Sequence, residues 1–224
     1  MASVLVPLAQ GCEELEAITV IDLLRRAGID VVTAGLDDSP IRASRGSMLL
    51  ADMTLDQALQ RDYDMVVLPG GLPGADHLDK DVRVHELLKS MADAGRYTAA
   101  ICAAPKVLAH AGLLQGRRAT SYPGAFAPES VEGLEYVDQP VVQDGRVITS
   151  RGPGTAMDFA LELIELLAGR DRRDEVEALA IFDVDHTITR SSTGRRLVEC
   201  GRRAGLFSFR NLIVMPYYYL RYRM

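Results

Sequence analysis

The sequence predicts an α/β fold built on a mostly parallel sheet, and three features of the chain support this class. Short apolar runs rich in β-branched residues recur along its first half, as in strands that are buried on both faces. Segments with the apolar period of a helix lie between most of these runs. Several of the segments stop at a glycine, which is typical of helix ends. This alternation implies a sheet covered on both sides, whose functional residues gather at the carboxyl ends of the strands.

The elements predicted for the first half follow this alternating order. The strands are Val4–Leu8, Val31–Gly35, Met65–Leu68 and Thr98–Ile101. The helices are Leu15–Ala27, which stops at Gly28, and Val82–Ala94, which stops at Gly95. A further helix is expected for the segment APKVLAHAGLL, because its proline suits the first turn of a helix, where a missing N–H costs nothing.

The second half contains a predicted hairpin, a helix and a change of character. The segment PVVQDGRVITS should turn at Asp144-Gly145, a common hairpin dipeptide. The segment TAMDFALELIELLAG is a strongly amphipathic helix that stops at Gly169. Arg170–Glu177 is highly charged and is expected to be a linker or the polar end of a helix. Residues 1–169 should therefore form one domain, and a second α/β domain should start at residue 178.

Composition limits the classes of function. The chain has 224 residues, of which 48% are hydrophobic and 25% charged, and its net charge is -6. These values are typical of a globular protein and argue against nucleic acid or an anionic membrane as the main partner. Cys12, Cys102 and Cys200 form no C-x-x-C motif, so neither a disulfide framework nor a zinc site is indicated. A reducing, cytoplasmic location is expected, since the N-terminal apolar run is too short for a signal peptide.

The central question is whether Cys102 is a buried structural thiol or a nucleophile. It follows the apolar strand segment YTAAI and precedes a helix with Pro105 in its first turn. A thiol at this turn would face the free N–H groups of Ala103 and Ala104, which stabilise a thiolate and can lower its pKa. Most free cysteines, however, are small core residues. The turn by itself leaves both interpretations open.

Two other stretches favour a functional cysteine. Pro69–Gly71 ends the neighbouring predicted strand, and glycine there lets backbone N–H groups approach a ligand or an oxyanion. The segment GCEELEA follows the first strand and brings three carboxyl groups to the same edge of the sheet. A carboxyl group beside a thiolate tends to stay protonated and can then move a proton. For Glu13 and Glu14 we expect only a solvated helix N-terminus, and the residues alone do not decide the role of Glu16.

Together these stretches resemble a known family. The segments GCEELEA, VVLPGGLPGA, AAICAAPKVLAHAGL and TSRGPGTAMDFALELIELLAG occur in the order and spacing of the ThiJ/PfpI superfamily. The similarity covers about residues 2–169 and is closest to the branch of parkinsonism-associated protein deglycases. It implies a flavodoxin-like sandwich that forms homodimers, with Leu15–Arg26 near the interface, and that needs neither cofactor nor metal.

The resemblance also assigns roles to single residues. Cys102 corresponds to the nucleophilic, oxidation-prone cysteine of the family, and Glu16 to the protonated glutamate that hydrogen-bonds it. Gly71 and Ala103 correspond to residues whose backbone N–H groups surround the sulfur.

Four further positions bear on the resemblance. Arg26 and Arg45 match arginines near the dimer-facing side of the family's pocket. Protease-like members have a histidine after the cysteine, where this chain has Ala103, so protease activity is not expected. The deglycase branch often has a histidine where this chain has Tyr122. Tyrosine donates a hydrogen bond but is a poor base near neutral pH, so Glu16 would transfer protons alone.

A second motif lies near the C-terminus. The segment IFDVDHTITRSS resembles the first motif of the haloacid dehalogenase phosphatases, which implies Asp183 as nucleophile and magnesium ligand and Asp185 as acid and base. The later residues that hold phosphate and Mg²⁺ in such enzymes do not follow in this chain. Residues 178–224 are therefore expected to be an incomplete phosphatase-like fragment without activity.

The resemblance supports two hypotheses of function. The first is a cofactor-free glyoxalase or deglycase, in which Cys102 attacks methylglyoxal or its early adducts on proteins or nucleotides and Glu16 transfers the proton. The second is a redox-sensing chaperone that responds to oxidation of Cys102. A disulfide between Cys12 and Cys102 is a further possibility, which requires their Cα atoms to lie within ~7 Å.

Overall fold

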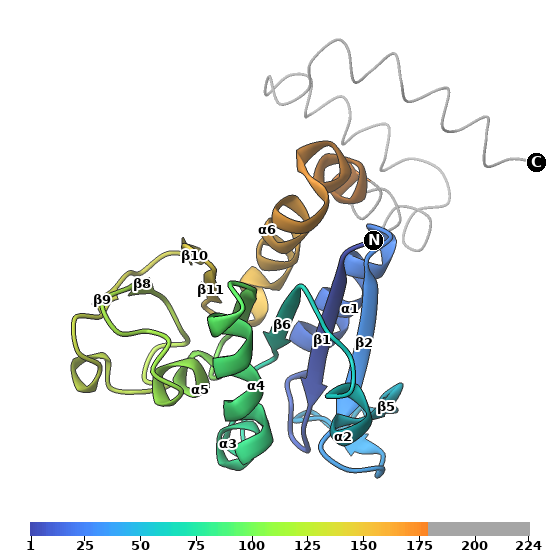
Figure 1. Ribbon diagram of the computed structural model, residues 1–224, viewed down its shortest axis with the longest axis horizontal. Coiled ribbons are helices and arrows are strands. Elements are labelled where there is room, and N and C mark those ends of the chain that lie inside the picture. Colours follow the sequence, from blue (N-terminus) through green and yellow to red (C-terminus); the bar gives the residue numbers. More distant parts are fainter. Residues whose placement is uncertain (179–224) are drawn as a thin grey trace, which may run out of the picture. The chain divides into compact units, whose positions relative to one another are not determined.

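Seven strands form the central sheet of the unit Met1–Val176, in the order β10-β11-β7-β6-β1-β2-β5 (Figure 1). The computed structural model describes residues 1–178. Neighbouring strands are parallel except for the pair β10 and β11. The strands of this sheet are β1 (Ser3–Leu8), β2 (Asp30–Gly35), β5 (Met53–Thr54), β6 (Met65–Leu68), β7 (Tyr97–Ile101), β10 (Val141–Asp144) and β11 (Val147–Ser150). The predicted α/β class with a mostly parallel, flavodoxin-like sheet is confirmed.

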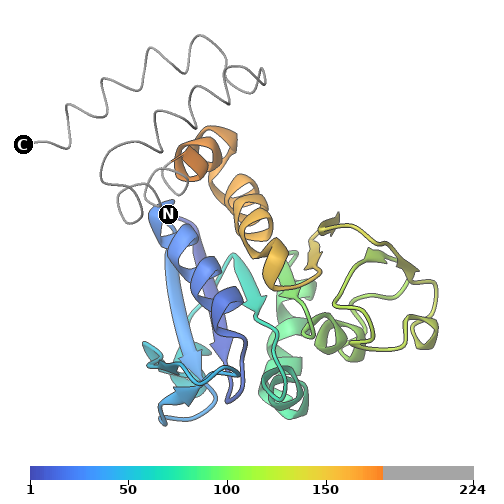
Figure 2. The same cartoon turned by 180° about the vertical axis from the view of Figure 1, so that it is seen from behind.

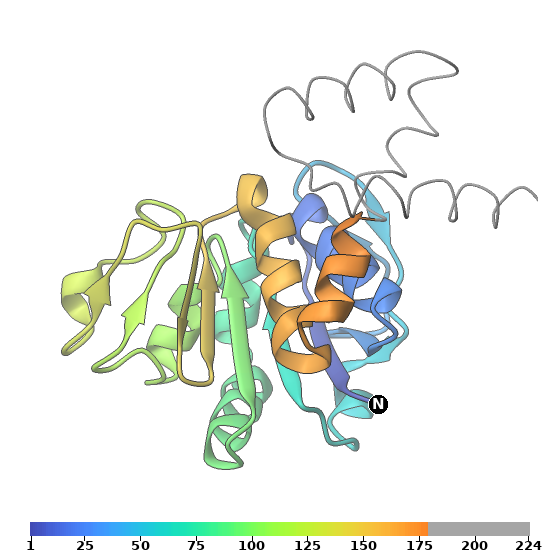
Figure 3. The same ribbon diagram turned by 90° about the horizontal axis from the view of Figure 1, so that it is seen from above.

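Helices cover both faces of this sheet. α1 (Glu14–Arg26) and α6 (Ala156–Ala168) pack against each other on one face (Figure 2 and Figure 3). The opposite face carries α3 (Gly74–Lys80), α4 (Val82–Asp93) and α5 (Pro105–His110) (Figure 1). Two helical layers exclude water from both sides of the sheet, so every residue of β6 is buried. This burial explains why the strands are continuous apolar runs.

The strand order brings three loops together at one edge of the sheet. β1 lies between β2 and β6, so the direction in which the chain adds strands reverses beside β1. β7 follows as the neighbour of β6. The loops after β1, β6 and β7, which begin at residues 9, 69 and 102, therefore meet at the carboxyl edge. Sheets of this kind bind ligands at such a switch point.

The predicted elements of the first half and the hairpin are confirmed, with small shifts at their ends. The hairpin turns through Gly145, whose φ is +61°. The helix after Cys102 is shorter than expected, because it ends at His110 and Gly112 follows with φ +81°. The sequence prediction missed α3 and the short α2 (Leu55–Ala58). It also missed two small sheets, one of β3 (Ile41–Arg42) with β4 (Met48–Leu49) and one of β8 (Arg118–Ala119) with β9 (Glu135–Tyr136).

The charged segment after α6 is helical. Residues 170–178 form a helix after a break at Gly169, so the structure shows a helix and not an irregular linker. The guanidinium of Arg172 donates hydrogen bonds to the carbonyl oxygens of Ala27, at 3.0 Å, and Arg26, at 2.7 Å. These contacts cover the C-terminal end of α1. The predicted phosphatase-like fragment with Asp183 and Asp185 lies outside the described residues, apart from residue 178, and stays a prediction.

Candidate active site

Cys102 lies on a strained turn between β7 and α5. Its φ is +64°, and among residues 1–178 it is the one residue other than glycine with a positive φ. Its N–H donates to the carbonyl of Ser150 at 2.9 Å, and its own carbonyl accepts from the N–H of Tyr122 at 2.8 Å. Neighbouring segments thus hold the strained conformation on both sides. Such strain persists where the surrounding structure over-determines it, often at functional sites.

Glu16 is the buried carboxyl group beside this thiol. It belongs to the first turn of α1 and is 0% exposed. The other buried residues of that helix are all apolar, so Glu16 is its one buried charged side chain. Its Oε2 accepts a hydrogen bond from the N–H of Gly70 at 2.9 Å. Its Oε1 is buried without a hydrogen-bond donor among the described residues. The carboxyl group lies within hydrogen-bonding range of the Cys102 side chain.

Burial and charge set the protonation of both groups. Burial raises the pKa of the Cys102 thiol to about 12, and the neighbouring Glu16 carboxylate adds to the rise. The N–H groups of Gly71 and Ala103 approach the sulfur and oppose this rise. The prediction of a lowered thiol pKa was therefore wrong for a thiol that faces an ionised Glu16. Burial also raises the pKa of Glu16, to about 7, against hydrogen bonds from Cys102 and Gly70.

The two groups titrate as a pair because they are in contact. The first proton leaves the pair with a pKa of about 7. Transfer of the remaining proton from sulfur to Glu16 creates a thiolate without changing the charge of the pair. The thiolate then accepts from the N–H groups of Gly71 and Ala103. Oε1 of Glu16 accepts no hydrogen bond when the carboxyl group is ionised. When Oε1 carries the proton it can donate a hydrogen bond to the thiolate, which lowers the free-energy cost of burying this oxygen without a partner.

The raised pKa of Glu16 predicts a loss of stability as the pH rises. The folded protein holds the proton of Glu16 with a pKa of about 7, against an ordinary value of 4.5. Protonation therefore stabilises the fold fully below pH 4.5, and this contribution is lost as the pH rises through 7. At about 1.4 kcal/mol per pKa unit the loss amounts to ~3 kcal/mol.

Urea unfolding of the wild type and of Glu16→Gln measures this effect. The free energy of unfolding of the wild type, relative to the variant, should fall by ~3 kcal/mol between pH 4.5 and pH 8. Both proteins must be compared at one concentration, because subunit association also changes stability. A difference that does not depend on pH would contradict the raised pKa.

Glycines let the loops approach this pair closely. A Cβ atom added to Gly70 would lie 2.6 Å from the Cys102 Cβ and 2.7 Å from the Glu16 Oε2. Gly71 has φ +89°, and a Cβ atom there would lie 2.4 Å from the backbone nitrogen of Glu13. Gly152 lies on the other side of the thiol, since its added Cβ atom would be 3.8 Å from the Cys102 sulfur. The same atom would be 3.4 Å from the ring of Tyr122, which is exposed beside the thiol.

Glu13 and Glu14 have more specific contacts than the solvated helix N-terminus that the sequence suggested. The Glu13 carboxylate caps α1 by accepting a hydrogen bond from the N–H of Glu16 at 2.7 Å. The Glu14 carboxylate accepts from the N–H of Arg45, at 3.0 Å and 3.1 Å, and from the hydroxyl of Ser44, at 3.2 Å. Glu13 thus positions Glu16, and its spacing of three residues is the signal that could have indicated it.

The two arginines suggested by the resemblance lie in different places. The backbone of Arg45 is held at the N-terminal end of α1 by Glu14. Arg26 ends the same helix and forms an ion pair with Asp22 at 2.7 Å. Because a helix rises about 1.5 Å per residue, Arg26 lies roughly three turns from Glu16. Arg26 is therefore remote from the Glu16 end of its own helix, and its expected place near the dimer-facing side of the pocket stays a prediction.

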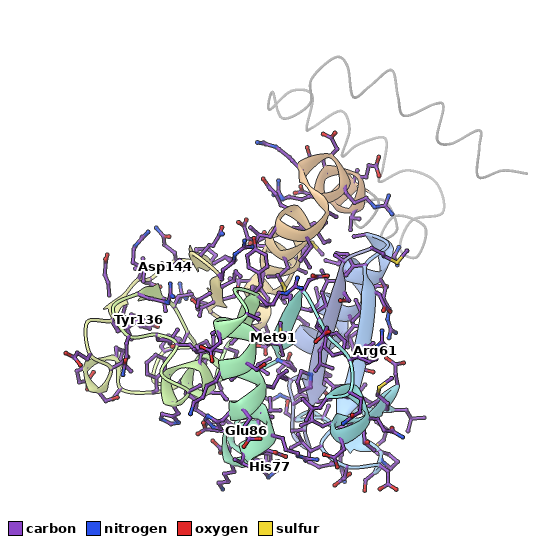
Figure 4. The ribbon with its side chains drawn as sticks, viewed as in Figure 1. Arg61, His77, Glu86, Met91, Tyr136 and Asp144 are labelled. Atoms are coloured by element: carbon purple, nitrogen blue, oxygen red, sulfur yellow. The ribbon has the colours of Figure 1, made fainter. Side chains whose placement is uncertain are left out.

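The described histidines lie away from the thiol. His77 on α3 contacts the carbonyl of Gln10 through Nδ1 at 2.8 Å (Figure 4). His110 pairs with Asp79 at 2.8 Å, and His85 contacts the backbone carbonyl of Asp79 at 2.7 Å. These contacts connect α3, α4 and α5, so the three residues have structural roles. His186 lies outside the described part of the chain.

Cys12 is a fully buried free thiol. Burial and the nearby carboxylates of Glu14 and Glu13 raise its pKa to about 11. Its backbone is packed tightly, since a Cβ atom added to Gly74 would lie 2.5 Å from the Cys12 nitrogen. Both cysteines are free thiols in the structure, and a disulfide between Cys12 and Cys102 stays a prediction.

Fold and site together define a class of protein: a flavodoxin-like α/β protein with a cysteine on a strained strand-to-helix turn and a buried carboxyl partner. The chain belongs to the DJ-1/PfpI family, whose family model matches residues 2–166. None of the helices within residues 1–178 is long and apolar enough to cross a membrane.

Three relatives illustrate the match. Protein dj-1beta of Drosophila melanogaster is 48% identical over 176 residues, which cover 78% of this chain and 94% of that protein. Its crystal structure matches with a TM-score of 0.77 at 46% identity, over 80% of this chain and 97% of that one. A structure of Toxoplasma gondii DJ-1, described as oxidized, matches with a TM-score of 0.75 at 37% identity, over 81% and 98% of the two chains. The glutathione-independent glyoxalase DJR-1.2 of Caenorhabditis elegans is 35% identical over 175 residues, which cover 78% of this chain and 92% of that protein.

Proposed function

We propose that the protein is a cysteine-dependent glyoxalase and deglycase that needs no cofactor. The observation that carries this proposal is the buried Glu16 carboxyl group against the Cys102 side chain, with the Gly71 and Ala103 N–H groups at the sulfur. This arrangement supplies a nucleophile, a proton carrier and hydrogen-bond donors in one place. The relative from Caenorhabditis elegans that is named a glutathione-independent glyoxalase supports the same reaction class.

The reaction follows from these three parts. The Cys102 thiolate attacks the aldehyde carbon of methylglyoxal, and the carbonyl oxygen takes the proton that Glu16 holds, which gives a hemithioacetal. Glu16 then removes the hydrogen from that carbon as a proton, which leaves an enediolate. Glu16 returns the proton to the neighbouring carbon, and the hydroxyl proton of the hemithioacetal passes to the oxygen of that carbon, which gives a lactoyl thioester. Water cleaves the thioester and releases lactate and the thiol. An early methylglyoxal adduct on a protein or nucleotide can enter the same sequence by losing its amine.

Formation of lactate tests the proposal. The purified protein should convert methylglyoxal to lactate without added glutathione, and the product is measured with lactate dehydrogenase. A preparation that forms no lactate above the buffer rate would refute the glyoxalase function.

A second candidate function is redox sensing followed by chaperone activity. The N–H groups that approach the sulfur can also hold the oxygens of a sulfinate, and peroxide would be the oxidant. The related Toxoplasma gondii structure described as oxidized favours this candidate. Mass spectrometry after mild peroxide treatment should find two added oxygen atoms on Cys102. Suppression of aggregation of a client protein should then increase with oxidation, and an equal effect of both forms would exclude the sensor.

We further propose that the protein is a homodimer that buries one face of α1. Leu15 and Ile18, three residues apart on this helix, are 51% and 47% exposed, and Met157 on the adjacent α6 is 45% exposed. Such neighbouring apolar side chains form a patch that association would remove from water. Light scattering at micromolar concentration should show a dimer for the wild type and a monomer for Ile18→Glu. The control Val82→Glu changes an exposed residue on α4 and should stay dimeric, whereas a monomeric wild type would contradict the proposal.

A further inference from the structure

A groove near the turn that carries Cys102 has no role in the proposed reaction with methylglyoxal. Its volume is about 340 Å³, which lies in the range of small-molecule sites. It belongs to the part of the chain around β8 and β9, where Figure 4 labels Tyr136. The lining includes Ser121, Pro123, Phe126, Pro128, Tyr136 and Arg151.

Two separate segments connect this groove to Cys102. Ser121 lines the groove, and the next residue, Tyr122, donates its N–H to the Cys102 carbonyl at 2.8 Å. Arg151 lines it as well, and the next residue, Gly152, faces the Cys102 sulfur. Consecutive Cα atoms are about 3.8 Å apart. Each of these two segments therefore places one residue at Cys102 and the next residue in the lining of the groove.

The lining favours an aromatic group. Phe126 and Tyr136 supply two aromatic rings, and the prolines add rigid apolar surface. The Tyr136 hydroxyl donates to the carbonyl of Ser121 at 3.0 Å, which fixes its ring against the wall. Arg151 is held at the groove by an ion pair with Asp138 at 2.8 Å, so its planar guanidinium is available for stacking on a ring.

We propose that this groove binds the aromatic substituent of an aryl α-oxoaldehyde such as phenylglyoxal while the aldehyde carbon reacts with Cys102. The proposal rests on the glyoxalase function and names its preferred substrate class. The reaction is the same and consumes only water. The thiolate adds to the aldehyde carbon, the carbon-bound proton and the hydroxyl proton of the resulting hemithioacetal pass to the neighbouring carbon and its oxygen, and hydrolysis of the thioester releases mandelate and the thiol. Buried ring surface should raise kcat/KM over that for methylglyoxal.

The experiment compares two substrates in matched variants. We expect kcat/KM of the wild type to be higher for phenylglyoxal than for methylglyoxal. Phe126→Ala should lower the value for phenylglyoxal about tenfold or more and leave that for methylglyoxal unchanged, because lost apolar contacts affect only the ring. The control Val82→Ala removes an exposed apolar side chain on α4 and should change neither value.

A binding measurement separates this proposal from the catalytic one. Titration with mandelate and lactate should show a preference for mandelate of about tenfold in the wild type, and Phe126→Ala should abolish it while circular dichroism shows an intact fold. If Phe126→Ala lowers kcat/KM equally for both substrates, or if the wild type does not bind mandelate more tightly than lactate, the proposal that the groove binds the ring is wrong. A wild type that turns over neither substrate refutes the glyoxalase function, and the preference for mandelate then still decides whether the groove binds the ring.

Discussion

Replacing Cys102 with serine is expected to lower kcat/KM for methylglyoxal by at least about 10³-fold. A serine hydroxyl is a far weaker nucleophile than a thiolate, and it is far less acidic than a thiol, so it gives up its proton to Glu16 less readily than Cys102 does. Serine keeps nearly the same shape, so the turn between β7 and α5 should survive. Lactate formation and thermal unfolding of the two proteins would be measured together.

The matched control for this substitution is Cys12→Ala. It removes the other free thiol of the described chain, which is fully buried and forms no part of the proposed mechanism. Its activity should stay close to that of the wild type. Substantial lactate formation by Cys102→Ser, or an equal loss in both variants, would exclude Cys102 as the nucleophile.

Substitution of Glu16 should cost about 10²- to 10⁴-fold in kcat/KM, the range expected for loss of a general acid and base. Glu16→Gln preserves the size of the side chain, and its amide can still donate a hydrogen bond to sulfur, but it cannot carry a proton between the two carbons. Glu16→Leu removes both abilities. Turnover should therefore fall in both variants, and more in Glu16→Leu.

Alkylation of Cys102 by iodoacetamide separates the two roles. In Glu16→Gln the thiol should still react with iodoacetamide although turnover is lost, since the nucleophile remains in place. Glu86→Gln on α4 (Figure 4) is the control, because it removes an exposed carboxyl group from a helix that contributes no residue to the proposed mechanism. If the wild type, Glu16→Gln and Glu16→Leu were equally active, Glu16 would have no part in the mechanism.

Much of the fold could be predicted because its main elements are specified locally. β1, β2, β6 and β7 are buried apolar runs, and α1 and α4 carry apolar residues on one face. The missed elements are short. β3, β4, β8 and β9 have two residues each, and contacts with distant segments rather than local pattern hold such strands.

The candidate site was predictable only in part. The position of Cys102 between a strand and a helix with Pro105 is visible in the sequence, because both elements leave a local pattern. The role of Glu13 as the cap of α1 and the contact of Gly70 with Glu16 were not predicted. The cap is a local contact that the three-residue spacing of Glu13 and Glu16 could have indicated. The contact between Gly70 and Glu16 joins residues far apart in the chain, so it exists only after folding.

The sequence by itself determined the alternating α/β architecture and the turn that carries Cys102, since hydrophobic period and turn chemistry are local properties. Only the tertiary structure decided the charge state of the site. The pKa of Glu16 rises to about 7 because the fold removes its carboxyl group from water and places it against Cys102. Desolvation and proximity between residues far apart in the chain exist only after the sheet and α1 have packed.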